Sequence, residues 1–201
     1  MVKKFIATFI FFITLFFSFP IYSIQGNEIF ETKITPINNR EYFPSVLDKI
    51  KNAKKSIYII MYLASYYPEY PESPSNQIIN ALINKKKENI KIEIILEQSD
   101  SKYDEHLKTE NLKTGSILAK NGITVHLDSP EIKTHSKLLI IDEKYVIIGS
   151  TNWSYSALEK NNETSVIIES PKCAEYYIGY FEKIKKECPT KILPHFPSNS
   201  Q

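Results

Sequence analysis

Short aliphatic runs alternate with amphipathic stretches along most of this 201-residue chain. Apolar residues recur at helical spacing in the amphipathic stretches, and near-continuous apolar runs are typical of strands buried on both faces. The pattern predicts helices at 44–55, 76–87, 111–121 and 171–187, and strands at 28–37, 56–63, 90–97, 123–127, 137–141, 145–148 and 163–169. Irregular structure is expected at 64–75 and from Pro189 onward. This order predicts an α/β fold, a mixed and mostly buried β-sheet flanked by helices.

The N-terminal segment has the pattern of a secretory signal peptide. Lys3 and Lys4 precede an apolar run at 5–19, Ser23 offers a small residue for cleavage, and no acidic residue occurs before Glu28. The apolar run is shorter than the ~20 residues that a membrane-spanning helix needs, so cleavage is favoured over a retained anchor. We therefore expect an exported protein, periplasmic or secreted, with residues 1–23 as the signal peptide and 24–201 as one domain.

Charge gives little support to a large nucleic-acid interface. Two of the 25 basic residues fall within the predicted signal peptide, so 23 basic residues remain against 23 acidic ones and the formal net charge of the mature chain is zero. A protein that grips long nucleic acids usually has a basic surplus, because phosphate contacts dominate that affinity. The remaining lysine clusters are expected on the solvated faces of helices.

The two cysteines favour neither a disulfide within the chain nor a metal site. Export would permit a bridge between Cys173 and Cys188. The predicted helix at 171–187 would hold them ~20 Å apart, so a bridge would need a break in that helix or a second subunit. Neither the cysteines nor the histidines have the spacing of metal ligands, and we expect no metal and no cofactor.

One stretch combines an apolar strand with side chains that an apolar core would exclude. His135 and Lys137 are two residues apart at the start of a predicted strand, and Ser150 and Asn152 are two apart just after the next one. Alternate residues of a strand face the same side, so these four polar groups are expected around one small space. A lone histidine is usually structural and a lone lysine usually solvated, but the joint spacing favours a site for a phosphate ester. Other histidines, at 106, 126 and 195, have no such neighbours and are expected to be structural.

The same residues carry a resemblance to a known family. His135, Lys137 and Asp142 match the His-x-Lys-x-x-x-x-Asp motif of the phospholipase D superfamily, and both the Gly-Ser-Thr-Asn at 149–152 and Glu163 match its downstream pattern. The chain holds one copy of the motif and in this resembles small secreted bacterial endonucleases and the mitochondrial cardiolipin hydrolase. The resemblance implies a homodimer that builds one shared active site, with an inactive half-site as the alternative.

The resemblance also implies a role for each residue in a metal-independent phosphodiesterase. His135 would attack phosphorus to form a phosphohistidine, while His135 of the partner subunit would protonate the leaving oxygen and then activate water. Lys137, Asn152 and Ser150 would bind the phosphate oxygens, and Glu163 would accept a hydrogen bond from the far imidazole nitrogen. Asp142 has the opposite strand parity to Lys137, so we expect it to be structural.

The substrate stays open between two kinds of phosphodiester. Tyrosines at 62, 66, 67 and 70, in a proline-rich segment, would stack nucleic-acid bases, rest at a lipid interface or form an ordinary surface loop. The small, single-motif build favours an exported nuclease that cleaves DNA or RNA; the alternative is hydrolysis of phospholipid head groups. A third alternative is a catalytically inactive exported binding protein, against which the intact set of His135, Lys137, Asn152 and Glu163 argues.

Overall fold

A single mixed sheet organises the part of the protein that the structure describes. This computed structural model describes residues 32–98 and 105–192, so the predicted signal peptide lies outside it. The strands are β1 (Lys33–Pro36), β2 (Ser56–Met61), β3 (Lys91–Leu96), β4 (Thr124–Leu127), β5 (Lys137–Ile141), β6 (Tyr145–Gly149), β7 (Ser165–Glu169) and β8 (Thr190–Ile192). Their order across the sheet is β1-β7-β6-β5-β2-β3-β4-β8. The predicted mixed, mostly buried sheet is confirmed.

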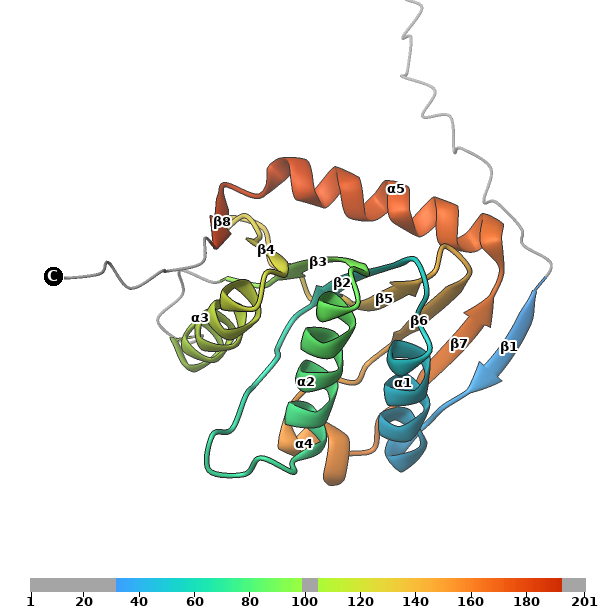
Figure 1. Cartoon of the computed structure of the whole chain (residues 1–201), viewed down its shortest axis with the longest axis horizontal. Helices are drawn as coiled ribbons and strands as arrows, with labels where there is room; N and C mark the ends of the chain where they lie inside the picture. Colours follow the sequence, from blue (N-terminus) through green and yellow to red (C-terminus); the bar gives the residue numbers. More distant parts are fainter. Residues whose placement is uncertain (1–31, 99–104, 193–201) are drawn as a thin grey trace, which may run out of the picture.

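Helices cover both faces of the sheet. They are α1 (Tyr42–Lys51), α2 (Pro74–Lys87), α3 (Glu105–Lys120), α4 (Tyr155–Glu159) and α5 (Pro171–Glu187), with a 3-10 turn, η1 (Asn39–Glu41), before α1. Figure 1 shows α5 running across one face, while α1, α2 and α3 lie on the other. Among the described residues, no helix is long and apolar enough to cross a membrane.

Strand β2 shows why an unbroken apolar run is needed at the centre of this sheet. Its six residues are all buried. Ile57 and Ile59 pack in the larger apolar cluster with α1 and α2, whereas Tyr58 and Ile60 pack with Phe181 of α5 on the opposite face. Successive side chains of a strand alternate faces, so a strand with helices on both sides must be apolar throughout.

The sheet joins a parallel half to an antiparallel half. Strands β2, β3 and β4 are parallel and are connected through α2 and α3. Strands β5, β6 and β7 are antiparallel to their neighbours, and β5 pairs with β2 at the junction of the two halves. The carboxyl end of β2 therefore lies beside the amino end of β5, where the His-x-Lys motif begins.

Helix starts follow the expected capping chemistry. Ser73 and Ser170 cap α2 and α5, each followed by proline at the first helical position. The Ser170 hydroxyl accepts the Cys173 N–H at 3.3 Å. Such caps satisfy backbone donors that have no partner within the helix.

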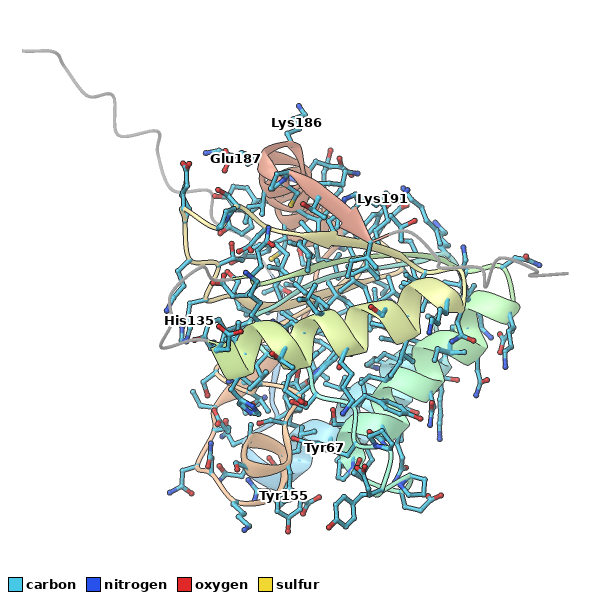
Figure 2. All side chains as sticks on the ribbon, turned by 90° about the vertical axis from the view of Figure 1, so that its left-hand side faces the viewer. Tyr67, His135, Tyr155, Lys186, Glu187 and Lys191 are labelled. Carbon is cyan, nitrogen blue, oxygen red and sulfur yellow. The ribbon has the colours of Figure 1, made fainter. Side chains whose placement is uncertain are left out.

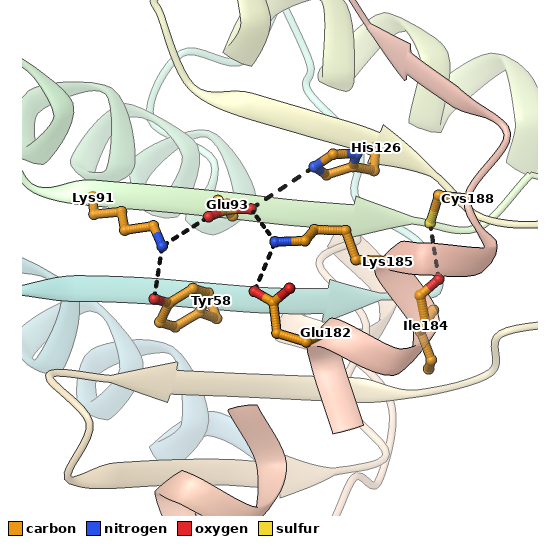
Figure 3. Close-up of polar contacts among 8 residues, drawn as sticks. All are labelled: Tyr58, Lys91, Glu93, His126, Glu182, Ile184, Lys185 and Cys188. Carbon is orange, nitrogen blue, oxygen red and sulfur yellow. Dashed lines mark hydrogen bonds and ion pairs between the residues drawn. The ribbon is translucent and has the colours of Figure 1, made fainter. Parts of the chain in front are cut away.

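A polar network attaches α5 to the sheet. The Glu93 carboxylate of β3 lies 3.0 Å from the ammonium groups of both Lys91 and Lys185, as Figure 3 shows. His126 of β4 lies 3.9 Å from the same carboxylate. Burial alone would raise the pKa of Glu93, but the two lysines hold it below its usual value. His126 therefore has a charged neighbour that its position in the sequence did not indicate.

Several predicted boundaries need correction. The tail was expected to be irregular from Pro189, but Thr190–Ile192 forms β8 on the edge of β4. Helix α3 begins at Glu105 rather than near residue 111, and the five-residue α4 was not predicted. Three or five residues are too short to show a period, and within Glu105–Glu110 only Leu107 is buried.

Both cysteines are free thiols. Cys173 lies in the first turn of α5 and Cys188 caps its other end, with an unbroken helix between them. This confirms the argument against a bridge along one helix. Burial raises the pKa of both thiols, that of Cys188 to about 11.

Candidate active site

The predicted site residues meet at one end of three antiparallel strands. Lys137 opens β5, and Ser150 follows the last residue of β6. Leu138 pairs with Ile148, so the start of β5 lies beside the end of β6. Gly149 pairs with Ser165 and the Ser150 N–H donates to the Thr164 carbonyl at 2.9 Å, which brings Glu163 to the same place. Five predicted site residues, up to 28 positions apart in the sequence, thus lie at or just beyond one end of the sheet: His135, Lys137, Ser150, Asn152 and Glu163.

Lys137 is a buried ammonium with hydrogen-bonding capacity to spare. The residue is only 6% exposed. The Nζ donates to the His135 carbonyl oxygen at 2.9 Å and lies 4.6 Å from the centroid of the Tyr62 ring. Burial lowers the pKa of Lys137, while Glu163 and Glu97 oppose that shift. An ammonium has three donors, so two remain for an anionic ligand.

His135 is exposed at the edge of the molecule, where Figure 2 labels it. Its imidazole meets the Tyr62 ring edge-on, with centroids 4.3 Å apart. Partial desolvation lowers the pKa of His135, and the positive charges of Lys137 and Lys133 lower it further. The imidazole is therefore neutral near pH 7, the form in which a ring nitrogen can act as a nucleophile.

Glu163 contacts other residues than the sequence predicted. Its carboxylate accepts hydrogen bonds from the Ser150 hydroxyl and, at 3.0 Å, from the Asn161 amide. The Glu163 N–H donates to Asn39 Oδ1 at 2.7 Å. Within one chain the carboxylate thus orients Ser150, and the described contacts do not include the expected hydrogen bond to His135. The reason is local: β6 and β7 are adjacent, and β5 lies one strand further away.

Asn152 is half-buried with unused hydrogen-bonding capacity. Its Oδ1 is buried and has no hydrogen-bond partner among the described residues. Next in the chain, Trp153 is fully buried in the core and donates to the Tyr42 hydroxyl at 3.2 Å. Buried polar groups are almost always hydrogen-bonded in native proteins, which makes Asn152 a candidate to contact a ligand or a partner chain.

Asp142 lies beyond the other end of β5, away from His135. Its carboxylate accepts hydrogen bonds from the backbone N–H groups of Lys54 and Lys55 and, at 3.2 Å, from that of Ser56. Asp142 and Glu143 have φ of +56° and +55° in the turn that joins β5 to β6. The last residue of the motif thus ties this turn to the start of β2, as its strand parity predicted.

Two of the cavities on the described surface bear on the site, and of the five predicted site residues only His135 lines the smaller one. A cavity of about 330 Å³ lies between His135 and α5, and Tyr180 and Lys183 form its far wall. A larger cavity of about 720 Å³ lies around Tyr67 and Tyr155, which Figure 2 shows well away from His135. The larger volume lies among exposed loop side chains, so the chemistry rather than the size identifies the site.

The sequence did not indicate which residues support the site. Tyr62 contacts both His135 and Lys137. Asn111 is fully buried, and its amide donates to the carbonyl oxygens of Tyr62 and Glu97 at 2.7 and 2.8 Å. A polar residue within the apolar pattern of a helix was the available signal for Asn111. For Glu97, the signal was an acid placed directly after a buried strand.

Comparison with known proteins agrees with the fold and the motif. Residues 46–185 match the family described as cardiolipin synthase, PLD-like domain. The phospholipase D of Rickettsia prowazekii is 32% identical over 133 residues, which cover 66% of this chain and 57% of that protein. The mitochondrial cardiolipin hydrolase of Mus musculus is 37% identical over 81 residues, 40% of this chain and 37% of that protein. The match thus spans 57% of the length of the first of these curated relatives and 37% of the second.

Solved structures show the same fold at lower identity. Nuc of Salmonella typhimurium, a phospholipase D family member, has a TM-score of 0.66 at 24% identity over 81% of this chain and 99% of that one. NucT of Helicobacter pylori has a TM-score of 0.60 at 22% identity over 79% and 98%. The matched family covers more than half of the chain and includes the residues of the site from His135 to Glu163. The chain belongs to the phospholipase D-like family.

Proposed function

We propose that this protein is a metal-independent phosphodiesterase. Neutral His135 attacks the phosphorus, the P–O bond to the leaving group breaks, and a phosphohistidine forms. His135 of the partner subunit, in its protonated imidazolium form, gives its proton to the leaving oxygen and, now neutral, takes a proton from the water that cleaves the P–N bond. Lys137 stabilises the charge on the non-bridging oxygens, together with Asn152 and the hydroxyl of Ser150.

One observation carries this proposal above the others. An exposed imidazole just before β5 and the buried ammonium of its first residue lie beside the end of β6, after which Ser150 and Asn152 supply a hydroxyl and a carboxamide. The lysine raises the proportion of neutral imidazole by lowering the pKa of His135. A nucleophile with a fixed positive charge beside it suits attack on an anionic phosphodiester, because the positive charge stabilises the negative charge that develops on the phosphate oxygens in the transition state.

The cavity beside His135 supports nucleic acid as the substrate. Lys183 and the half-exposed Tyr180 line it on α5, and lysines with aromatic rings are the groups that bind a nucleic-acid strand. The described fold matches 99% of Nuc and 98% of NucT, and this one-domain build favours the same choice. We therefore propose an exported nuclease that acts on DNA or RNA.

A second candidate function rests on the apolar rim of the same cavity. Ile132 is 62% exposed and lies beside His135 and Tyr180. Exposed apolar and aromatic side chains next to a reactive site suit a lipid surface. The names of the curated relatives, phospholipase D and mitochondrial cardiolipin hydrolase, favour hydrolysis of a phospholipid head group.

A substrate panel in chelator tests the chemistry and the substrate together. Purified protein would be incubated in EDTA with single-stranded DNA, plasmid DNA, RNA, labelled phospholipid vesicles and the small diester bis(p-nitrophenyl) phosphate. We expect full activity on the small diester in EDTA, because no step uses a metal. Cleavage of the polynucleotides would support the nuclease and release of lipid head groups the phospholipase. Loss of all hydrolysis in EDTA would refute the histidine mechanism.

Activity is also expected to depend on dimer formation. If one site uses His135 from two subunits, specific activity on the small diester should fall at least about tenfold on dilution below the dimer dissociation constant, because the monomer lacks the general acid. Light scattering coupled to gel filtration would give the oligomeric state at each concentration. A monomer with undiminished specific activity would contradict the shared site.

A further inference from the structure

Two buried acids lie directly behind the motif and have no part in the chemistry above. Glu97 follows β3 and Asp128 follows β4, and each is 1% exposed. The preceding residues, Leu96 and Leu127, are paired in the parallel register, so the two carboxyl groups leave neighbouring strands side by side. Two ionised carboxylates at such a place would repel each other and would both lack hydration.

The hydrogen bonds of Glu97 and Asp128 show how the repulsion and the loss of hydration are avoided. Glu97 Oε2 accepts the Thr134 N–H at 2.5 Å, and Asp128 Oδ1 accepts the Gln98 N–H at 2.6 Å. Asp128 Oδ2 is buried and has no donor among the described residues if both acids are ionised. The register of Leu96 with Leu127 sets the Glu97 carboxyl group beside Asp128, and, after burial, a hydrogen bond between the two acids raises the pKa of Glu97. A proton on Glu97 would supply the missing donor, as in other pairs of neighbouring carboxyl groups.

Glu97 also joins the site to the rest of the sheet. Thr134, whose N–H it accepts, directly precedes His135. The backbone of Glu97 is held in turn, because its carbonyl oxygen accepts the Asn111 amide and its N–H donates to the Met61 carbonyl. The position of the carboxyl group thus determines where the backbone enters the His-x-Lys segment.

We propose that Glu97 is a positioning residue which, in its neutral acid form, bridges Asp128 and the Thr134 N–H and so fixes the backbone that presents His135 and Lys137. The inference rests on the proposed phosphodiesterase function of the same site. The Glu97 hydroxyl donates to Asp128 Oδ2, and its other oxygen accepts from Thr134. The buried polar atoms of the pair are then all satisfied with one negative charge between them.

The protonation state of the pair gives the proposal a pH signature. Burial and, next, Asp128 raise the pKa of Glu97, whereas the Thr134 hydrogen bond and Lys133 lower it. The net effect is a pKa of about 8. Among the described residues, Lys137 also faces Glu97 and the thiol of Cys188 faces Asp128. As the pH rises through about 8, Glu97 loses its proton and two neighbouring carboxylates repel each other. The bridge is therefore complete below that pH and is lost above it.

Two substitutions separate the bridge from the charge. In Glu97→Gln the amide oxygen can accept from Thr134 while the amide nitrogen donates to Asp128 at every pH. We expect this variant to keep kcat on bis(p-nitrophenyl) phosphate within about threefold at pH 7. Relative to wild type, its kcat should rise about tenfold by pH 9, where about nine-tenths of the wild-type Glu97 is ionised. In Glu97→Ala we expect kcat to fall at least about tenfold with little change in KM, because substrate contacts remain but His135 is displaced.

Glu131→Ala supplies the matched control, since Glu131 is exposed in the loop between Asp128 and Thr134 and only its backbone N–H, which donates to the Ser129 hydroxyl, takes part in the described hydrogen bonds. Its kcat and pH profile should equal those of wild type. If Glu97→Gln shows the same alkaline loss as wild type, the positioning role is wrong. Wild type without activity on any diester would instead refute the proposed function.

A measurement that needs no activity covers the case in which Glu97→Ala does not fold. The amide resonance of Thr134 should shift with an apparent pKa near 8 in wild type and stay constant in Glu97→Gln, because its acceptor no longer titrates. Two-dimensional ¹H–¹⁵N spectra between pH 6 and 10 would record it. A Thr134 amide that does not titrate in wild type would overturn the proposal.

Discussion

Replacing His135 by alanine is expected to lower kcat on a small phosphodiester by at least about 10³-fold, because the variant loses the nucleophile and, in a dimer, the general acid as well. The side chain is exposed, so the melting temperature should change little. The hydrolysis rate of bis(p-nitrophenyl) phosphate measures the effect. Trapping of a phosphohistidine in wild type and its absence in the variant would identify the attacking group.

His106→Ala is the control for this experiment. His106 is also exposed, but it lies in the first turn of α3 and outside the cavity that contains His135. Wild-type activity is expected for this variant. A His135→Ala enzyme that keeps even a tenth of the wild-type kcat would show that the reaction proceeds without this imidazole.

The second large effect is expected for Gly149→Ala, on stability and on activity together. A Cβ at this position would lie 2.5 Å from the Cα of Ser165 and closer still to the Thr164 carbonyl oxygen. Gly149 and Ser165 are paired across β6 and β7, so the backbone must shift to make room. Overpacking of this kind costs ~1–3 kcal/mol, and more where backbone cannot yield. Urea unfolding should show the loss, and the displaced Ser150 should lower kcat.

Gly179→Ala is the matched substitution for comparison. Gly179 lies within α5, and a Cβ there meets no atom within 4 Å. The helix should gain ~0.5–1 kcal/mol, because alanine loses less conformational entropy than glycine on folding. Equal effects of the two substitutions on the free energy of unfolding would show that the close approach at Gly149 does not constrain the site.

The sequence predicted best those elements whose pattern extends over several turns or pairs. The bounds of β5 and α5 match the prediction, because aliphatic runs and capping residues mark both ends. Strand β8 and helix α4 depend on tertiary contacts instead: β8 pairs with the edge of β4, and Tyr155 of α4 donates its N–H to the Tyr67 hydroxyl. Contacts between distant segments leave no local period to detect.

The site residues also divide into those whose placement follows from a local pattern and those whose placement depends on contacts between distant segments. Strand parity predicted a shared face for His135 and Lys137, because a two-residue period is a local property of a strand. The register of β5 and β6 then brings the start of one strand beside the end of the other, where Ser150 and Asn152 follow. The hydrogen-bond partner of Glu163 depended on which strands are neighbours. Glu163 lies just before β7, and the sheet order places β7 beside β6. The pairing of Glu97 with Asp128 depended on the register of two parallel strands joined through α3, which the sequence alone does not define.

The division of the sheet into two halves has a consequence for how such a protein can diversify. The reactive side chains all come from one continuous stretch, from His135 to Glu163, whereas the cavity beside them is walled on its far side by α5. Under the proposed function, substitutions on α5 would alter the groups that meet a substrate without moving the proposed nucleophile, His135, or the proposed phosphate-binding residue, Lys137. Substrate range and reaction chemistry would then be encoded in separate segments, and one could change in evolution while the other is preserved.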